Sequence, residues 1–409
     1  MLFTDWRLMA RRHPNSNSCN KSGYSQTMWT RWAVLCGSFA TGSVLALAIV
    51  AQTAVHWPLW EGYASFAIND QGRVIDHQGG DRTTSEGQSY GLFFALVAND
   101  RVRFDRLQKW TTDNLASGDL GTKLPGWLWG KSPAGEWQIL DQNSASDADL
   151  WIAYSLCEAG RLWRQPQYGI LGRQMLARIA ADEVVELPGF GTMLLPGAAG
   201  FHPTADTWLL NPSYLPLPLL ARLAVIDPQG PWLGIAGKVP SLLEKSTRNG
   251  FAMDWVSYRP TDGFQPASRP GNPGEPGGSY DAIRVYLWAG LTHPEAKGRA
   301  QTLDALHGMA DYLATHGLPP EQINGDGTAA AGNAPVGFSA ALLLYLQAKG
   351  AKLLVSTQKA RVMGQFDPKT NLFGKPPTYY DENLTLFGLG GNQHMFAFGR
   401  DGELQVTWK

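Results

Sequence analysis

Acidic residues stand just before several apolar segments of this 409-residue chain, where carboxyl groups could do acid–base chemistry. Three of them are Glu86, Asp147 and Asp281, and each precedes a largely apolar run. An acidic residue at the start of a helix commonly serves only to cap it. The chemical alternative requires two such groups in one site, one protonated and one ionised, acting as general acid and general base.

Two of these starts have the residue pattern of a capping box. Ser85 is followed three residues later by Gln88, and Ser146 by Asp149. In a capping box, the first side chain accepts a hydrogen bond from the amide of the fourth residue, and the fourth side chain binds back. The pattern predicts that helices begin at Ser85 and Ser146, each with an acidic residue in its first turn.

Similar signals recur along the chain. Asn211 before Pro212 and Ser279 before Tyr280 predict two more starts, and weaker signals stand at 333–335 and at 381–383. The six starts lie near positions 86, 147, 212, 281, 335 and 382, so successive starts are 47 to 69 residues apart. Each interval has room for one helix out and one helix back. We therefore expect an all-α fold with its six helix starts on one face.

The expected fold is an (α/α)6 barrel, in which six helical hairpins form a closed ring with short extended loop segments. The extended segment is expected at 187–200, where glycine is frequent. The return helices are expected at 103–115, 171–182, 232–248, 300–315 and 353–363.

The segment 145–163 resembles the signature of glycoside hydrolase family 8. It reads ASDADLWIAYSLCEAGRLW and matches that signature nearly throughout. TSEGQSYG at 84–91, NPSY at 211–214 and YDAIR at 280–284 resemble the family's other landmarks, in the same order. The likeness extends from about residue 57 to the C-terminus and is particularly clear to the endoglucanases that accompany bacterial cellulose synthases.

The resemblance implies an endo-1,4-β-glucanase that hydrolyses internal linkages of cellulose with two carboxyl groups in an inverting mechanism. Glu86 would be the general acid and Asp281 the general base, with the two groups about 6.5–9.5 Å apart. Asp147 would hydrogen-bond the sugar at the cleavage subsite and favour its distorted ring, and Tyr214 would hold the attacking water. Arg284, one helical turn beyond Asp281, would orient a carboxylate; an ordinary structural ion pair is the alternative.

Two opposing influences act on the pKa of Glu86. A helix N-terminus favours the ionised carboxylate and lowers the pKa. Burial and repulsion from Asp147 would raise it. A general acid requires that the second influence outweighs the first near neutral pH.

Aromatic side chains are candidates for sugar-binding platforms, because flat rings stack on the apolar faces of pyranose units. Of the 16 tryptophans, 13 follow residue 51, and most of those within helices are expected in the core. By their position relative to the motifs, four residues resemble the family's subsite platforms: Trp129, Trp208, Tyr280 and Tyr380.

Two other functions stay open on the sequence alone. One is a β-1,4-xylanase of the same family, and the other is a non-catalytic glycan-binding component of cellulose export. The expected partner is a β-1,4-glucan polysaccharide, with a cellulose synthase complex as a further candidate. The net charge of −1 offers no general attraction to nucleic acid. The eight histidines show no paired spacing, so neither a metal site nor another cofactor is expected.

The N-terminal residues 1–54 have the pattern of a signal peptide or an N-terminal anchor. Basic residues precede an uncharged run from Trp32 to Val55, and initiation at Met28 would leave a leader of ordinary proportions. Cleavage would place the catalytic domain, 55–409, in the periplasm or outside the cell, without stable membrane contact. Cys157 would then be the one remaining cysteine, expected in the core.

Overall fold

The computed structural model describes residues 54–271, 274–330 and 332–409. The predicted leader, apart from its last residue, and the alternative start at Met28 lie outside these residues. In the described part of the chain, no helix has both the length and the apolar character needed to cross a bilayer.

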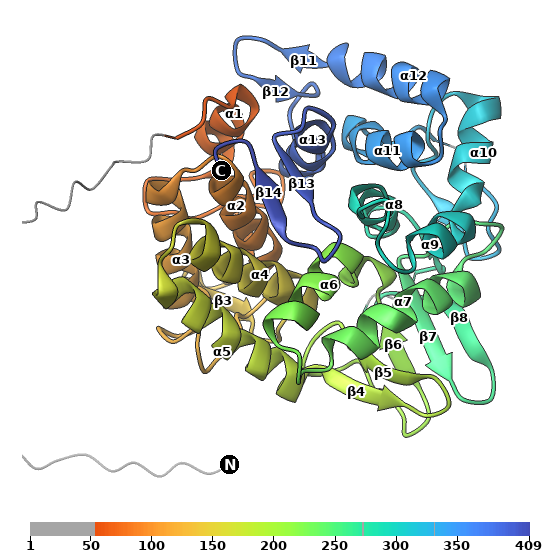
Figure 1. Cartoon of the computed structure of the whole chain (residues 1–409), viewed down its shortest axis with the longest axis horizontal. Coiled ribbons are helices and arrows are strands. Elements are labelled where there is room, and N and C mark those ends of the chain that lie inside the picture. Colours follow the sequence, from red (N-terminus) through yellow and green to blue (C-terminus); the bar gives the residue numbers. More distant parts are fainter. Residues whose placement is uncertain (1–53, 272–273, 331) are drawn as a thin grey trace, which may run out of the picture. The chain divides into compact units, whose positions relative to one another are not determined.

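Six helices form an inner ring (Figure 1). They carry buried residues on nearly all sides, because neighbouring helices, the outer layer and the ring centre surround them. Each helix contacts the next one around the ring, and Phe387 of the last packs against Tyr90 and Phe93 of the first. The inner helices are α2 (Ser85–Val97), α4 (Ser146–Leu162), α6 (Leu217–Ile226), α8 (Ala282–Leu291), α11 (Val336–Ala348) and α13 (Tyr379–Asn392).

The remaining helices form an outer layer. They are α1 (Pro58–Ala67), α3 (Arg101–Leu115), α5 (Pro166–Asp182), α7 (Trp232–Ser246), α9 (Arg299–Ala305), α10 (His307–His316) and α12 (Lys352–Met363). The outer helix α1 contacts α13, so the first helix of the chain completes the sixth hairpin with the last. The predicted (α/α)6 ring is confirmed, and the predicted outer helices agree with the structure, except that 300–315 is divided into α9 and α10.

The two predicted capping boxes are wrong in detail. Thr84, one residue before the expected cap, accepts the Gly87 amide at 3.1 Å and caps α2. Gln88 does not bind back to the helix start; its amide oxygen instead accepts the Val74 amide at 2.6 Å. Helix α4 begins at Ser146, but no side chain caps it. The helix starts themselves were therefore found to within one residue, although their hydrogen bonds were not.

The other starts differ by a few residues. Asn211 accepts the Ser213 amide and starts a short 3-10 helix, η1 (Pro212–Tyr214), before α6 begins at Leu217. Thr378 caps α13, three residues before the expected signal.

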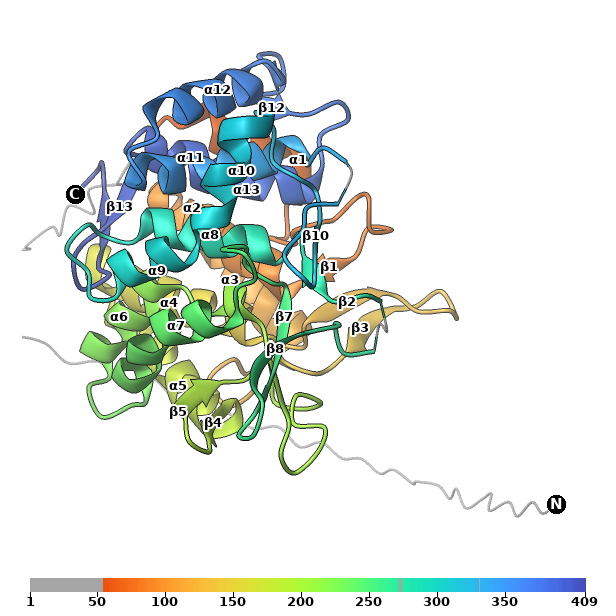
Figure 2. The ribbon, with the colours of Figure 1, turned by 90° about the vertical axis from the view of Figure 1, so that its right-hand side faces the viewer.

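Short strands connect the helices, and most of them lie on one side of the ring (Figure 2). The extended segment predicted at 187–200 overlaps the hairpin of β4 and β5, which begins earlier, at Val184. The strands, with their sheets, are β1 (Thr83–Thr84), β2 (Leu128–Lys131) and β3 (Trp137–Asp141); β4 (Val184–Leu187) and β5 (Gly191–Leu194); β6 (Trp208–Leu210), β7 (Trp255–Arg259) and β8 (Gly263–Ala267); β9 (Gly277–Gly278) and β10 (Ile323–Asn324); and β11 (Phe366–Asp367) and β12 (Leu372–Phe373).

A C-terminal hairpin of β13 (Phe396–Phe398) and β14 (Leu404–Val406) crosses the ring in Figure 1. It binds the C-terminal half of α4, where the Tyr154 hydroxyl donates to the Gly402 carbonyl at 2.8 Å. Phe398 continues inward and packs against Trp151 and Phe93. The centre of the ring is thus filled with aromatic side chains at this end.

Candidate active site

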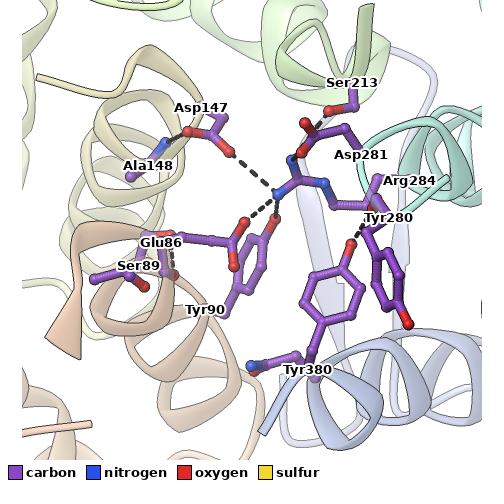
Figure 3. Close-up of polar contacts among 12 residues, drawn as sticks. Glu86, Ser89, Tyr90, Asp147, Ala148, Ser213, Tyr280, Asp281, Arg284 and Tyr380 are labelled. Carbon is purple, nitrogen blue, oxygen red and sulfur yellow. Dashed lines mark hydrogen bonds and ion pairs between the residues drawn. The ribbon is translucent and has the colours of Figure 1, made fainter. Parts of the chain in front are cut away.

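One guanidinium group joins the three acidic residues singled out from the sequence (Figure 3). Arg284 Nη1 donates to Glu86 Oε2 and, at 3.2 Å, to Asp147 Oδ2. Arg284 Nη2 donates to Asp281 Oδ1 at 2.6 Å. Residues almost 200 positions apart in the chain therefore meet at one point, because α2, α4 and α8 all begin on the same face of the ring.

Neutral groups complete the surroundings of Arg284. The Tyr90 hydroxyl accepts from Nη1 and the Ser213 hydroxyl accepts from Nη2, both at 3.1 Å. The Tyr379 hydroxyl donates to the second oxygen of Glu86 at 3.5 Å. Arg284 is thereby fixed from four inner segments, α2, α4, η1 and α8.

The side chains of the cluster differ in their exposure to solvent. Arg284 is 1% exposed and Asp147 is 5% exposed. Glu86 and Asp281 are 22% and 27% exposed, so they are the acidic groups of the cluster that solvent or a substrate can reach most readily. The arrangement is a buried cation beneath two accessible carboxyl groups.

The electrostatics of the cluster raise the pKa values of Glu86 and Asp147. Burial raises the pKa of Glu86, Asp281 adds to that effect, and Arg284 opposes it. Burial raises the pKa of Asp147 to about 7, again against the attraction of Arg284. The expected direction for Glu86 is therefore present, although the neighbour that raises its pKa is Asp281 rather than Asp147.

Tyr214 ends η1 beside the cluster. Its ring centroid lies 5.6 Å from the Arg284 guanidinium, and its edge faces Trp255. The side chain is in position to contact the groups around Arg284, and its role in holding water stays a prediction.

Two of the four predicted platforms lie together. The Tyr280 and Tyr380 rings are 5.7 Å apart, and the Tyr380 hydroxyl donates to the Tyr280 carbonyl. Tyr280 is 44% exposed, and its hydroxyl donates to Glu321 at 2.9 Å. Since Tyr280 directly precedes Asp281, both rings lie close to the acidic cluster (Figure 3).

The two tryptophans among the predicted platforms are more enclosed. Trp208 is buried, and the His202 ring stacks on it at 4.6 Å. Trp129 stacks on Trp137 at 4.9 Å and meets the edge of Trp110. Both residues are less exposed than Tyr280, and their contacts with sugar stay predictions.

Trp127, which was not among the predicted platforms, directly precedes β2, and its backbone adjoins the start of α2 next to Glu86. Its carbonyl oxygen accepts the Ser85 amide at 3.0 Å, directly before the acid. The guanidinium of Arg269 lies 5.7 Å from its ring. Its adjacency in the fold arises from pairing between β1 and β2, which has no local sequence signal.

Sequence reasoning also missed several polar residues of the cluster: Tyr90, Ser213, Asp254 and Tyr379. Tyr90 could have been found, since it lies four residues after Glu86 and thus on the same face of α2. Ser213 stands within the NPSY motif. Asp254 and Tyr379 reach the site only through tertiary packing.

Comparison with known proteins agrees with this geometry. The model for "Glycosyl hydrolases family 8" matches residues 35–394. The chain belongs to glycoside hydrolase family 8. An endoglucanase of Xanthomonas axonopodis pv. citri is 45% identical over 378 residues, which cover 92% of this chain and 95% of the relative. An endoglucanase of Escherichia coli K12 is 43% identical, with 89% and 95% covered.

A solved structure shows the same fold. The crystal structure of endo-1,4-D-glucanase from Vibrio fischeri ES114 has a TM-score of 0.74 and 38% identity, and the match covers 86% of this chain and 99% of that one. The protein is accordingly a glycoside hydrolase with the fold of its family. The predicted resemblance is confirmed over most of the chain.

Proposed function

We propose that this family 8 protein is an endo-1,4-β-glucanase that cleaves internal linkages of cellulose or of a nascent β-1,4-glucan by inversion. The proposal rests on one observation, the convergence of Glu86, Asp147 and Asp281 on Arg284. The endoglucanase names of the relatives support the choice of glucan as substrate.

The two accessible carboxyl groups take the two halves of the reaction. Glu86 donates its proton to the glycosidic oxygen as the bond from that oxygen to the anomeric carbon breaks. Asp281 accepts a proton from water as the water oxygen bonds to the anomeric carbon from the opposite side. The raised pKa of Glu86 suits the first role, because the acid must hold its proton near neutral pH. The spacing of about 6.5–9.5 Å between the two groups is part of the proposal.

Asp147 and Tyr214 assist without exchanging protons with the glycosidic bond. Asp147 binds a sugar hydroxyl at the cleavage subsite and favours the distorted ring. Tyr214 holds the attacking water against Asp281. Arg284 fixes the relative positions of the three acids, since its guanidinium group contacts each of them. Trp129, Trp208, Tyr280 and Tyr380 are proposed platforms for the glucan.

Glu86→Gln tests the enzyme against the non-catalytic alternative. The amide keeps the shape of the side chain but cannot donate the acid proton, so release of reducing ends from carboxymethylcellulose should fall at least about 10³-fold. Binding of the polymer should remain. Glu244→Gln, at an exposed position on the outer helix α7, is the matched control and should retain the wild-type rate.

Two results would contradict the proposal. Wild-type protein that binds carboxymethylcellulose but releases no reducing ends would leave a glycan-binding protein. Faster hydrolysis of xylan than of carboxymethylcellulose and mixed-linkage glucan would instead identify a xylanase.

The proposal extends to export and to a role in bacterial cellulose biosynthesis, with a periplasmic or secreted mature protein. N-terminal sequencing of protein recovered outside the cytoplasm should find a start near residue 55. A full-length membrane-bound chain would show that residues 1–54 act as an anchor. Deletion of the gene in a cellulose-producing host should alter cellulose yield, and an unchanged yield would argue against the biosynthetic role.

A further inference from the structure

Asp281 stands at the start of α8, where an aspartate side chain usually accepts a hydrogen bond from a backbone amide of its own helix. It is the N-cap residue of α8, and the side chain of an N-cap aspartate commonly accepts amides of the first turn. Here the side chain makes no such bond. Its carboxylate faces Arg284 instead, which leaves it available to solvent at the acidic cluster.

The carboxylate of Asp254 takes over the capping. Its Oδ1 accepts the Ser279 amide at 2.8 Å and the Ala282 amide at 2.7 Å. These two amides stand on either side of Asp281 in the chain. Ser279, which the sequence suggested as a cap, donates its hydroxyl to the Glu321 carbonyl instead.

Asp254 is itself held firmly. Its amide donates to the Gly277 carbonyl at 2.8 Å, directly before β7. The neighbouring backbone approaches so closely that a Cβ on Gly278 would lie 2.1 Å from the Ala252 carbonyl oxygen. The Ala252 amide in turn donates to the Tyr286 hydroxyl of α8. The segment 252–254 therefore binds both the start and the body of α8.

We propose that Asp254 is a positioning residue for Asp281, an inference that rests on the proposed hydrolase function. Asp254 caps α8 in place of Asp281, so that the Asp281 carboxylate can point at Arg284 and at the water it activates. Without this external cap, the amides of Ser279 and Ala282 would lose their acceptor, and the Asp281 carboxylate would be free to turn to the adjacent Ala282 amide, as the Asp147 carboxylate accepts the Ala148 amide. A displacement of about 1 Å at a reacting group can cost about 10²-fold in rate.

The capping by Asp254 does not depend on the charge of its carboxyl group. Its side chain is partly buried, and burial first and then repulsion from Asp281 raise its pKa to about 7. Oδ1 is an acceptor in either protonation state, because a protonated carboxyl group retains its carbonyl oxygen. An asparagine can supply the same acceptor, whereas an alanine cannot.

Two substitutions separate positioning from general stability. In Asp254→Ala, kcat on carboxymethylcellulose should fall about 10²-fold while KM stays within about twofold. Asp254→Asn should keep kcat within about threefold, since the amide oxygen can accept both amides. Asp100→Ala is the matched control, because Asp100 likewise caps a helix, α3, through the Arg103 amide, but lies outside the acidic cluster. Its kcat should be unchanged.

Hydrogen exchange of the segment 279–287, followed by mass spectrometry, gives a measure that does not depend on activity. Exchange should quicken in Asp254→Ala and remain at the wild-type rate in Asp254→Asn and Asp100→Ala. If Asp254→Ala does not fold, Asp254→Ser replaces it, because the shorter hydroxyl cannot accept both amides.

The outcomes separate the two proposals. Unchanged exchange, or a kcat for Asp254→Ala equal to that of Asp100→Ala, would overturn the role of Asp254. Wild-type protein without hydrolytic activity would overturn the proposed function, and the exchange measurement would still decide whether Asp254 fixes the segment around Asp281.

Discussion

Buried acidic residues at the two ends of α4 differ in the number of donors and cations that surround them. Near its C-terminal end, Glu158 is fully buried and fully compensated: Arg222 Nε donates to it at 2.8 Å, Arg161 Nε at 3.0 Å and the Leu404 amide at 2.9 Å. These partners link α4 to α6 and to the C-terminal hairpin. A buried carboxylate with this many donors is part of the scaffold.

At the N-terminal end, acidic groups outnumber their cations. Asp149 is buried, and neither of its oxygens has a hydrogen-bond partner among the described residues. It interacts with Glu183, another buried acid, which accepts the Ser144 hydroxyl at 2.5 Å. Burial raises the pKa of Glu183 to about 8 and that of Asp149 well above its usual value. The raised pKa values indicate that the interior accommodates these two acids because they stay protonated, not because a cation neutralises them.

The difference indicates where the molecule tolerates the unfavourable free energy of burying acidic groups without enough cations. Such cost is concentrated beside the proposed reacting groups, since Asp149 lies two residues from Asp147 and Arg284 is shared by three acids. Perturbed acids commonly cluster at functional sites for this reason. Substitutions around Glu158 should therefore mainly lower the stability of the protein, whereas substitutions in the acidic cluster should mainly lower its activity.

The largest effect is expected at the scaffold end. Glu158→Ala leaves Arg222 and Arg161 without their shared carboxylate and should lower the free energy of unfolding by about 3–5 kcal/mol. Urea unfolding measures this loss, and kcat of the protein that remains folded should be unchanged. A loss no greater than that of the exposed-site variant Glu244→Ala would show that the two ends do not differ as described.

At the site end, Arg284→Lys should act mainly on activity. A single ammonium group cannot place two nitrogens against Glu86 and Asp281 at once, so kcat/KM on carboxymethylcellulose should fall about 10²-fold, or about 2.7 kcal/mol. Its unfolding free energy should fall by less than that of Glu158→Ala. Wild-type kcat/KM in the lysine variant would refute the organising role of Arg284.

The smallest effect concerns pH and the Asp149–Glu183 pair. Because the folded state keeps protons that the unfolded state releases, this pair lowers stability as pH rises from about 4.5 to about 8. Asp149→Asn places an amide donor beside Glu183 and should stabilise the protein relative to wild type by about 1–2 kcal/mol at pH 9, with little difference at pH 4. Thermal unfolding across this range measures the difference between the two proteins. A difference that does not vary with pH would contradict the shared-proton pair.

The ring was predictable because each hairpin repeats the same local signals. Thr-Ser-Glu at the start of α2 and Asn-Pro at the start of η1 are short-range features, and they mark where the inner segments begin without knowledge of their partners. The acids of the site could be predicted for the same reason, since they stand at those starts. Residues that reach the site from strands or loops, such as Asp254, could not, because only the folded chain brings residue 254 next to residue 281.

The hydrogen bonds at the helix starts show the same limit. Ser85 and Ser146 fit a capping motif, yet Thr84 caps α2 and nothing caps α4, whose first turn is buried among other elements. Tertiary contacts override local propensity where backbone and side chains are buried. Likewise, the His202 ring stacks on the indole ring of Trp208, a contact that the sequence alone did not predict.

The hairpin of β13 and β14 covers one end of the helical ring (Figure 1). Its turn binds Tyr154, and its first strand places Phe396 and Phe398 in the ring centre, so that aromatic side chains of the described residues close this end of the ring. Under the proposed function, a long glucan would lie across the face where α2, α4 and α8 begin, with both of its ends outside the ring. Scission in mid-chain needs no free end under that geometry, whereas a tunnel would have required one.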